Sequence, residues 1–165
     1  MAVVSNTSPI LALSAIDHLD LLRKQFDEVL IPEAVLAELK TDTDFRGTQV
    51  IRQAINEGLL KVKSIQNTRL AQALAMEIDY GEAEAIALAL ETQSPIILLD
   101  EYDGRAKARA LGLRPIGVLG VLLRAKKDGD IDSLKSIITA LQNDVGFFVS
   151  EELFMAILKQ AGEVK

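Results

Sequence analysis

Short apolar runs, most of them rich in β-branched residues, alternate along this chain with longer segments that carry apolar residues at helical spacing. The runs are residues 2–4, 28–31, 96–99 and 114–116, and residues 60–65 alternate in the manner of an edge strand. A run that is apolar throughout predicts a strand covered on both faces, which is typical of parallel sheets. Because parallel strands are joined by crossover helices, the sequence predicts a three-layer α/β/α fold around a central, mainly parallel sheet.

Helix signals fill the intervals between the predicted strands. Ser8-Pro9 supplies a hydroxyl cap and a proline for the first helical position. Asp79-x-x-Glu82 resembles a capping box, and Asp103 is well placed to cap the helix that ends at Gly112. The predicted helices cover residues 10–16, 19–23 and beyond, 32–40, 50–59, 69–76, 79–92, 104–111, 118–127, 132–141 and 150–160, and residues 41–48 are predicted to be a polar loop.

Composition limits the class of protein. At 165 residues the chain is predicted to be one domain, 1–165, with residues 130–165 forming C-terminal helices. It lacks cysteine, and His18 is its single histidine, so thiolate metal sites and His-based triads are excluded. The absence of a long apolar run and of a basic leader predicts a cytoplasmic protein without a membrane span.

Charge is unevenly distributed. The net charge is −6, yet residues 104–127 hold seven of the 18 basic residues and none of the 24 acidic ones. A basic stretch on an acidic chain suggests local steering of phosphates, although solvated helix faces explain it equally well. Aromatic residues are only 4% of the chain, which argues against a base-stacking platform for sequence-specific reading.

Acidic and amide side chains are the candidate functional groups. Asn6 follows the first predicted strand and Asp100 follows the run at 96–99, and ligands of open α/β sheets bind at such strand ends. Glu38 lies near the end of a predicted helix, and Glu82 near the start of another. Glu84 points to a different helix face from Glu82, so at most one of the pair is expected at a shared site. Oxygen ligands without His or Cys suit Mg²⁺ or Mn²⁺.

Other phosphate chemistries fit less well. Gly117-x-x-Gly120 lacks the spacing and the lysine of a P-loop. Ser5-Asn6-Thr7 offers neither the nucleophilic aspartate of a haloacid-dehalogenase-type phosphatase nor the acidic pair of a receiver domain. Metal-assisted cleavage of a phosphodiester remains the chemistry that the residue types favour.

Taken together, the chain resembles the PIN-domain family of metal-dependent ribonucleases, whose best-known members are the VapC-like toxins. The resemblance rests on residues 3–9, 31–39, 81–91 and 97–100. It implies that Asn6, Glu38, Glu82 and Asp100 occupy the family's acidic positions, with Ser8 as a polar support. The eighteen-residue step from Glu82 to Asp100 favours Glu82 over Glu84. Residues 147–153 and 161–163 resemble a prokaryotic subfamily that also reads Ser-Asn-Thr-Ser-Pro near the start.

The sequence departs from the family pattern at two positions. Asn6 stands where the family has its first aspartate, and Glu82 replaces another aspartate. An amide oxygen can still bind a metal, but it carries no charge and cannot act as a base. The resemblance therefore implies weakened metal binding, with one ion rather than two.

Two functions remain open. The first is a Mg²⁺- or Mn²⁺-dependent endoribonuclease, the toxin of a toxin–antitoxin pair, in which Arg105, Lys107 and Arg109 bind RNA. Its partners would be RNA, a small antitoxin and, through the C-terminal helix, a second copy of the chain. The alternative is a catalytically silent PIN-like module that binds RNA or a protein, which Asn6 favours.

Overall fold

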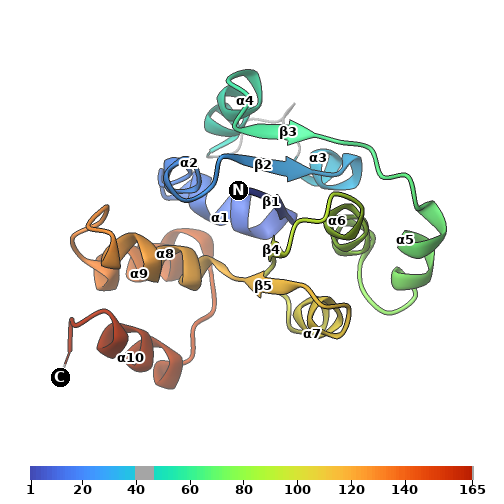
Figure 1. Cartoon of the computed structure of the whole chain (residues 1–165). Coiled ribbons are helices and arrows are strands. Elements are labelled where there is room, and N and C mark those ends of the chain that lie inside the picture. Colours follow the sequence, from blue (N-terminus) through green and yellow to red (C-terminus); the bar gives the residue numbers. More distant parts are fainter. Residues whose placement is uncertain (40–46, 165) are drawn as a thin grey trace.

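The computed structural model describes residues 1–39 and 47–164. Within these residues, five strands form one parallel sheet in the order β3-β2-β1-β4-β5 (Figure 1). The strands are β1 (Ala2–Ser5), β2 (Glu28–Ile31), β3 (Leu60–Val62), β4 (Ile96–Leu98) and β5 (Arg114–Ile116). The predicted α/β architecture is confirmed, and all the strand pairs of the described sheet are parallel.

Helices cover both faces of the sheet (Figure 1). They are α1 (Thr7–Ala15), α2 (Asp20–Gln25), α3 (Glu33–Leu39), α4 (Thr48–Asn56), α5 (Thr68–Leu74), α6 (Tyr80–Glu91), α7 (Tyr102–Ala110), α8 (Val118–Lys127), α9 (Leu134–Ala140) and α10 (Glu151–Gln160), with a π-helical turn at Leu141–Val145. α6 lies over β1 and β4 together with α5 and α7, whereas α1, α2, α4 and α8 pack on the opposite face.

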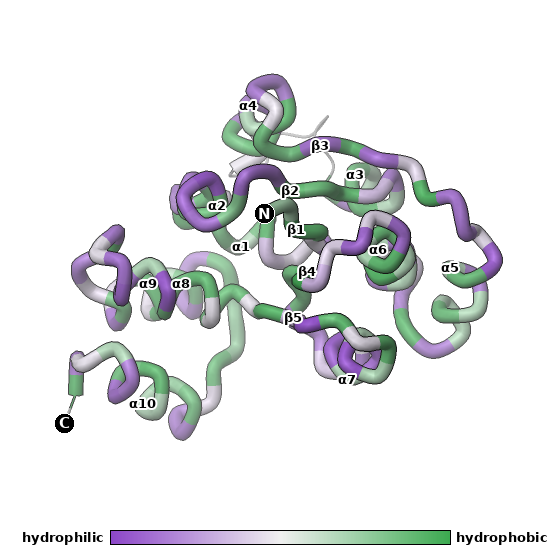
Figure 2. The backbone as a smooth tube through the Cα atoms, in the orientation of Figure 1, coloured by the Kyte–Doolittle hydropathy of each residue, from purple (hydrophilic) through white to green (hydrophobic). Residues whose placement is uncertain are grey.

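Alternate residues of each central strand enter different cores. Val3 and Leu98 belong to the core beneath α1 and α8, and their neighbours Val4 and Ile97 belong to the core beneath α6. These four side chains are fully buried, as expected where a parallel sheet is covered on both faces. The outer strand β3 lies at one end of the sheet and includes the hydrophilic Lys61 (Figure 2). Lys61 and Val62 are exposed, which agrees with the predicted edge strand.

Some helix starts differ from the predictions. α1 begins at Thr7 rather than after Ser8, because the extended backbone of Asn6 (φ −78°, ψ 176°) already occupies the cap position. Pro9 is then the third helical residue, where its missing N–H would have lacked a helical partner in any case. α7 begins at Tyr102 with Glu101 at its cap position, so the cap predicted at Asp103 is wrong.

Other boundaries shift by a few residues. β3 ends at Val62 rather than at residue 65, and α9 begins at Leu134 with Ser133 as its cap. The predicted loop at 41–48 lies mostly outside the described residues, and its last residue, Thr48, opens α4. Among the described residues, no helix is long and apolar enough to cross a membrane.

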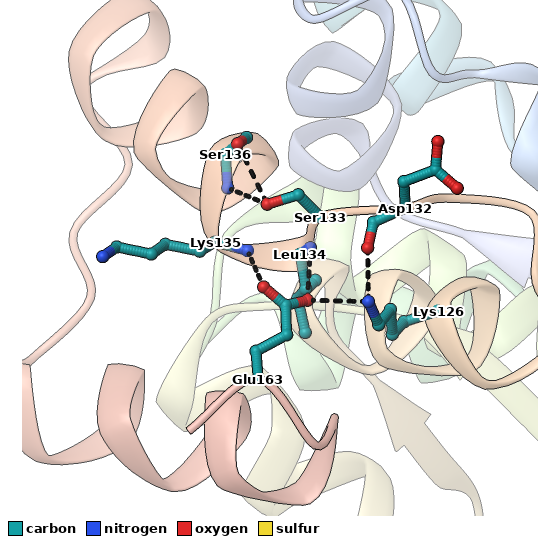
Figure 3. A network of polar contacts seen from close by, with 7 residues as sticks. All are labelled: Lys126, Asp132, Ser133, Leu134, Lys135, Ser136 and Glu163. Atoms are coloured by element: carbon teal, nitrogen blue, oxygen red, sulfur yellow. Dashed lines mark hydrogen bonds and ion pairs between the residues drawn. The ribbon is translucent and has the colours of Figure 1, made fainter. Parts of the chain in front are cut away.

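Glu163 attaches the end of the chain to the body of the protein (Figure 3). Its carboxylate accepts hydrogen bonds from the backbone N–H groups of Leu134 (2.6 Å) and Lys135 (3.1 Å) at the start of α9. The same carboxylate pairs with Lys126 of α8 at 3.3 Å. α10, which precedes Glu163, is thereby fixed beside α8.

Candidate functional site

Asn6 and Asp100 lie at the same edge of the sheet. Ser5 pairs with Leu98 in the register of β1 and β4, and the Asn6 N–H donates to the Leu98 carbonyl at 2.9 Å. Asn6 is 4% exposed. The two side chains therefore follow neighbouring strands at their carboxyl ends, where ligands of such sheets bind.

Glu38 reaches this edge from α3. Its Oε2 accepts a hydrogen bond from the hydroxyl of Thr7, the residue after Asn6, at 3.2 Å. Partial burial raises the pKa of Glu38, the Thr7 hydrogen bond opposes this, and the charge of Asp79 adds to it. α3 and α1 thus join at a polar contact beside Asn6.

Glu82 lies in the first turn of α6 and is 4% exposed. Its backbone N–H donates to Asp79 Oδ1 at 2.8 Å, which confirms Asp79 as the helix cap. Burial raises the pKa of Glu82 to about 8, with further contributions from a side-chain hydrogen bond with Asp79 and from the charges of Asp79, Glu101 and Glu38. A carboxyl group with this pKa is protonated at neutral pH until a bound cation displaces the proton into solvent or a base accepts it.

Asp100 caps a helix far along the chain. Its Oδ1 accepts the Val118 N–H of α8 at 3.0 Å, not an N–H of the next helix. Burial raises the pKa of Asp100, while the Val118 hydrogen bond and the charge of Arg105 lower it. The Arg105 guanidinium donates Nη1–H to the Leu99 carbonyl at 2.9 Å, which fixes it beside Asp100.

Glycines make room for the carboxylates. A Cβ on Gly81 would overlap Oε1 of Glu38, and one on Gly104 would lie 2.6 Å from Oε2 of Glu82. A Cβ on Gly117 would lie 2.5 Å from Oδ1 of Asp100. Each carboxylate therefore rests against the backbone of a neighbouring helix start.

The donor set suits a hard cation. Oδ1 of Asn6, Oδ2 of Asp100 and the Ser8 hydroxyl are buried and have no hydrogen-bond partner among the described residues. Buried oxygens with free lone pairs are costly unless a ligand or water satisfies them. The described residues contain no group of three or more His, Cys, Asp or Glu side chains arranged to enclose an ion. The amide of Asn6 and water would therefore have to complete the coordination, and Mg²⁺ commonly retains several waters.

Comparison with known proteins identifies the family. A model of the family DUF3368, described as a PIN domain, matches residues 2–163. The chain belongs to the PIN-domain family. No curated protein and no solved structure matches it significantly. Membership associates the chain with nuclease-like function and with nucleic acid in general terms.

The remaining predicted residues occupy different places in this PIN domain. Glu84 accepts the Ala34 N–H at 3.0 Å and so caps α3 from α6, away from Glu82. Lys107 pairs with Glu77, and Arg109 is exposed on α7. Of the three predicted RNA-binding residues, the described contacts tie Arg105 to the candidate site.

Sequence reasoning missed two acids and the glycines. Asp79 and Glu101 both act on Glu82 electrostatically, although neither was among the predicted site residues. Three glycines, Gly81, Gly104 and Gly117, each lie in or next to the first turn of a helix. A glycine at a helix start is the sequence signal that could have indicated a side chain packed closely against the backbone there.

A groove lies beside the site of the PIN domain. It has a volume of about 1000 Å³, and Ser8, Asp100 and Arg105 are among the residues that line it. Most of the remaining lining comes from α1, β4, β5 and α8 and from the segment that leads from Val145 through Phe148 into α10. This volume is at the upper end of the range that is typical of ligand sites.

Proposed function

We propose that this PIN domain is a Mg²⁺- or Mn²⁺-dependent endoribonuclease. The observation that carries the proposal is the gathering of Asn6, Glu38, Glu82 and Asp100 at one edge of the sheet, with buried, unpartnered oxygens on Asn6 and Asp100 among the described residues.

Asn6 and Asp100 would hold the ion through those oxygens, and Glu38 and Glu82 would act on it through bound waters and through their charge. When bound, such an ion supplies an activated water and stabilises charge on the leaving oxygen of a phosphodiester.

Neighbouring residues position these side chains. The Thr7 hydroxyl orients Glu38, the Val118 N–H orients Asp100, and Asp79 holds Glu82 at the start of α6. Arg105 has one N–H engaged with the Leu99 carbonyl and further donors that can bind a phosphate oxygen beside Asp100.

The test compares Asp100→Asn with Asp103→Asn, an exposed acid on α7 that serves as the matched control. Labelled RNA is incubated with each protein across a Mn²⁺ titration, and Mn²⁺ binding is measured in parallel by calorimetry. We expect Asp100→Asn to lose at least about 100-fold in cleavage and to bind Mn²⁺ more weakly, since it loses a charged ligand. Equal cleavage by the two variants would refute the site.

The second candidate is a catalytically silent binding module, and Asn6 is the observation that favours it. Asn6→Asp adds the negative charge and the second oxygen that the family pattern places there. If cleavage or Mn²⁺ affinity emerges only in Asn6→Asp, the natural protein is the silent form. If wild type already cleaves RNA, the silent alternative is wrong.

A toxin role with a small antitoxin partner is part of the proposal through the VapC-like resemblance. Co-purification of the tagged chain with a short protein that suppresses its RNA cleavage would support it. If the protein cleaves RNA but neither binds such a partner nor slows cell growth, it is a nuclease and the toxin role is wrong.

A further inference from the structure

The groove beside the candidate site has two chemically different walls. One wall, from β5, α7 and α8, combines Arg105, Arg114 and Arg124 with the apolar residues Pro115, Ile116 and Leu119. The other, which we call the C-terminal wall, is residues 145–148 with Leu153 and Ile157 of α10. A ligand lying in the groove would meet apolar side chains from both walls and guanidinium groups from the first wall alone.

Phe148 is the most exposed of the large apolar side chains in the C-terminal wall. It is 87% exposed, while its neighbour Phe147 packs partly against the core. Phe148 is not an isolated exposed residue, because it lines the groove together with Phe147, Leu153 and Ile157, and apolar residues grouped in a groove are typical of a ligand site. Phe147, whose N–H donates to the Leu141 carbonyl, precedes Phe148, and Ser150, the cap of α10, follows two residues later.

The charges of the groove suit a phosphate backbone. Arg114 and Arg124 are exposed and line the groove together with Arg105, on a protein whose net charge is −6. Arg124 also pairs with Asp128 through its Nε at 3.5 Å, which leaves its terminal N–H groups for a phosphate. Asp100 and Glu101 lie at the end where the metal would bind. The lining thus has two acids, whose charge a bound ion would neutralise, and three arginines, a balance that complements a polyanion once the ion is bound.

An added peptide strand fits the groove less well. Arg114 donates its N–H to Pro95 and Ile116 accepts from Leu99, so both residues turn their backbone groups toward β4. Pro115 between them therefore faces the open edge of β5, and it has no N–H to donate. Strand addition would lack that hydrogen bond.

We propose that the groove holds single-stranded RNA, with a base stacked on Phe148 and the backbone phosphates along Arg105, Arg114 and Arg124. This inference rests on the proposed function, because that function supplies RNA as the ligand. Stacking on a phenylalanine ring tolerates any base, so the recognition is of single strands rather than of sequence. The bases of a duplex are already stacked on one another and cannot cover the ring.

The experiment measures binding in a chelator, where no metal-dependent cleavage occurs. Fluorescence anisotropy gives the Kd of wild type, Phe148→Ala, Phe148→Trp and Met76→Ala for a labelled single-stranded RNA. It is repeated with the same oligonucleotide made abasic at successive positions and with the matching duplex. Met76 is 86% exposed and does not line the groove, so it controls for loss of exposed apolar surface.

We expect Phe148→Ala to weaken binding of the single strand about 5- to 100-fold, while Phe148→Trp and Met76→Ala bind as wild type does. An abasic position opposite the ring should weaken wild type and leave Phe148→Ala unaffected. Unchanged binding by Phe148→Ala, or equal affinity of wild type for duplex and single strand, would overturn the proposal. Binding of no oligonucleotide at all would also overturn it and assign the groove to a protein segment.

These outcomes are separable from those of the proposed function. A wild type that binds through Phe148 but cleaves no RNA with Mn²⁺ keeps the single-strand groove and loses the nuclease. A wild type that cleaves RNA with no dependence on Phe148 keeps the nuclease and loses the stacking platform.

Discussion

Gly81 shows how a residue without a side chain shapes the candidate site. Glycine inside a helix costs about 1 kcal/mol relative to alanine. Gly81 stands in the first turn of α6, where a Cβ would collide with the Glu38 carboxylate. Glycine at position 81 therefore weakens the start of α6, but it leaves room for the Glu38 carboxylate of α3.

Gly81→Ala should separate stability from metal binding. The new methyl group must displace the flexible end of Glu38, so we expect the free energy of unfolding to change by less than about 1 kcal/mol. Mn²⁺ affinity should fall about 5- to 10-fold, because a carboxylate that supports the bound ion is displaced. Calorimetry with Mn²⁺ and thermal melts check the two effects.

The control is the same substitution in Glu38→Ala. Without the Glu38 carboxylate the methyl group has room, so Gly81→Ala should stabilise this background by up to about 1 kcal/mol and leave its Mn²⁺ affinity unchanged. Equal effects of Gly81→Ala in both backgrounds would show that the two residues are not coupled.

Glu82→Gln should change the pH dependence of stability in a chelator. The folded pKa of Glu82 is about 8 and the ordinary value is 4.5. The stability that the protonated group contributes is present below pH 4.5 and is lost as the pH rises toward 8. Glutamine stays neutral, so Glu82→Gln should melt about 4–8 °C above wild type at pH 8 and close to wild type at pH 4. This corresponds to about 2 kcal/mol once solvent screening at the site is allowed for.

Asp79→Asn provides the internal check on that prediction. It removes one of the charges that raise the pKa of Glu82. In the Asp79→Asn background the pKa of Glu82 should therefore be lower, and the gain in melting temperature from Glu82→Gln at pH 8 should be smaller than with Asp79 intact. A difference between Glu82→Gln and wild type that does not vary with pH would contradict the prediction.

At the scale of elements, local patterns were predictable and long-range partners were not. The bounds of β2, β5 and α8 match the predictions, since each follows from a short apolar run or helical spacing. Asp79 caps α6 as its capping-box spacing predicts. Asp100, in contrast, caps α8, eighteen residues later. That contact arises only when β4 and β5 are paired, so no local pattern encodes it.

Glu84 illustrates the same limit. Its spacing from Glu82 predicts only that the two acids face different directions, and the structure shows that Glu84 caps α3 through the Ala34 N–H. Gly117 and Gly104 are comparable cases, because the carboxylate that each accommodates comes from another element. The metal role of the gathered acids stays a prediction.

Glu84→Ala should destabilise the protein without altering the site. Glu84 is 8% exposed, so its loss leaves the Ala34 N–H without its acceptor, which costs about 1–3 kcal/mol. Glu84→Gln retains an acceptor oxygen and should lose less than Glu84→Ala. Denaturant unfolding measures both, and Mn²⁺ affinity should equal that of wild type in each. A large loss of Mn²⁺ affinity in Glu84→Gln would mean that Glu84, not Glu82, serves the metal.

For the whole molecule, the parallel sheet explains why distant acids meet. All described strands point the same way, so residues that follow β1 and β4 emerge at one edge, and α3 and α6 start from connections at that edge. The C-terminal segment then adds the second wall of the groove, with α10 held beside α8. The site and its groove therefore depend on contacts from both ends of the chain.

Glu163→Gln tests how firmly the C-terminal wall is held. Burial opposes ionisation of Glu163, but the N–H groups of Lys135 and Leu134 and the charge of Lys126 outweigh it and lower its pKa below 4.5. Its contribution to stability is therefore present above pH 4.5 and is lost as the pH falls through the lowered pKa. Glutamine keeps an acceptor but not the charge, so we expect a loss of about 1 kcal/mol at pH 7 that shrinks toward pH 3.

Denaturant unfolding at pH 7 and pH 3 measures this difference, and Glu152→Gln, an exposed acid on α10, is the matched control with an expected change within about 0.5 kcal/mol. Because Glu163 closes the chain onto α8 and α9, hydrogen exchange in α10 should rise in Glu163→Gln more than exchange in β1 or β4. Faster exchange spread evenly over the sheet would mean that Glu163 supports the whole fold. Faster exchange confined to α10 would mean that it anchors the wall that carries Phe148.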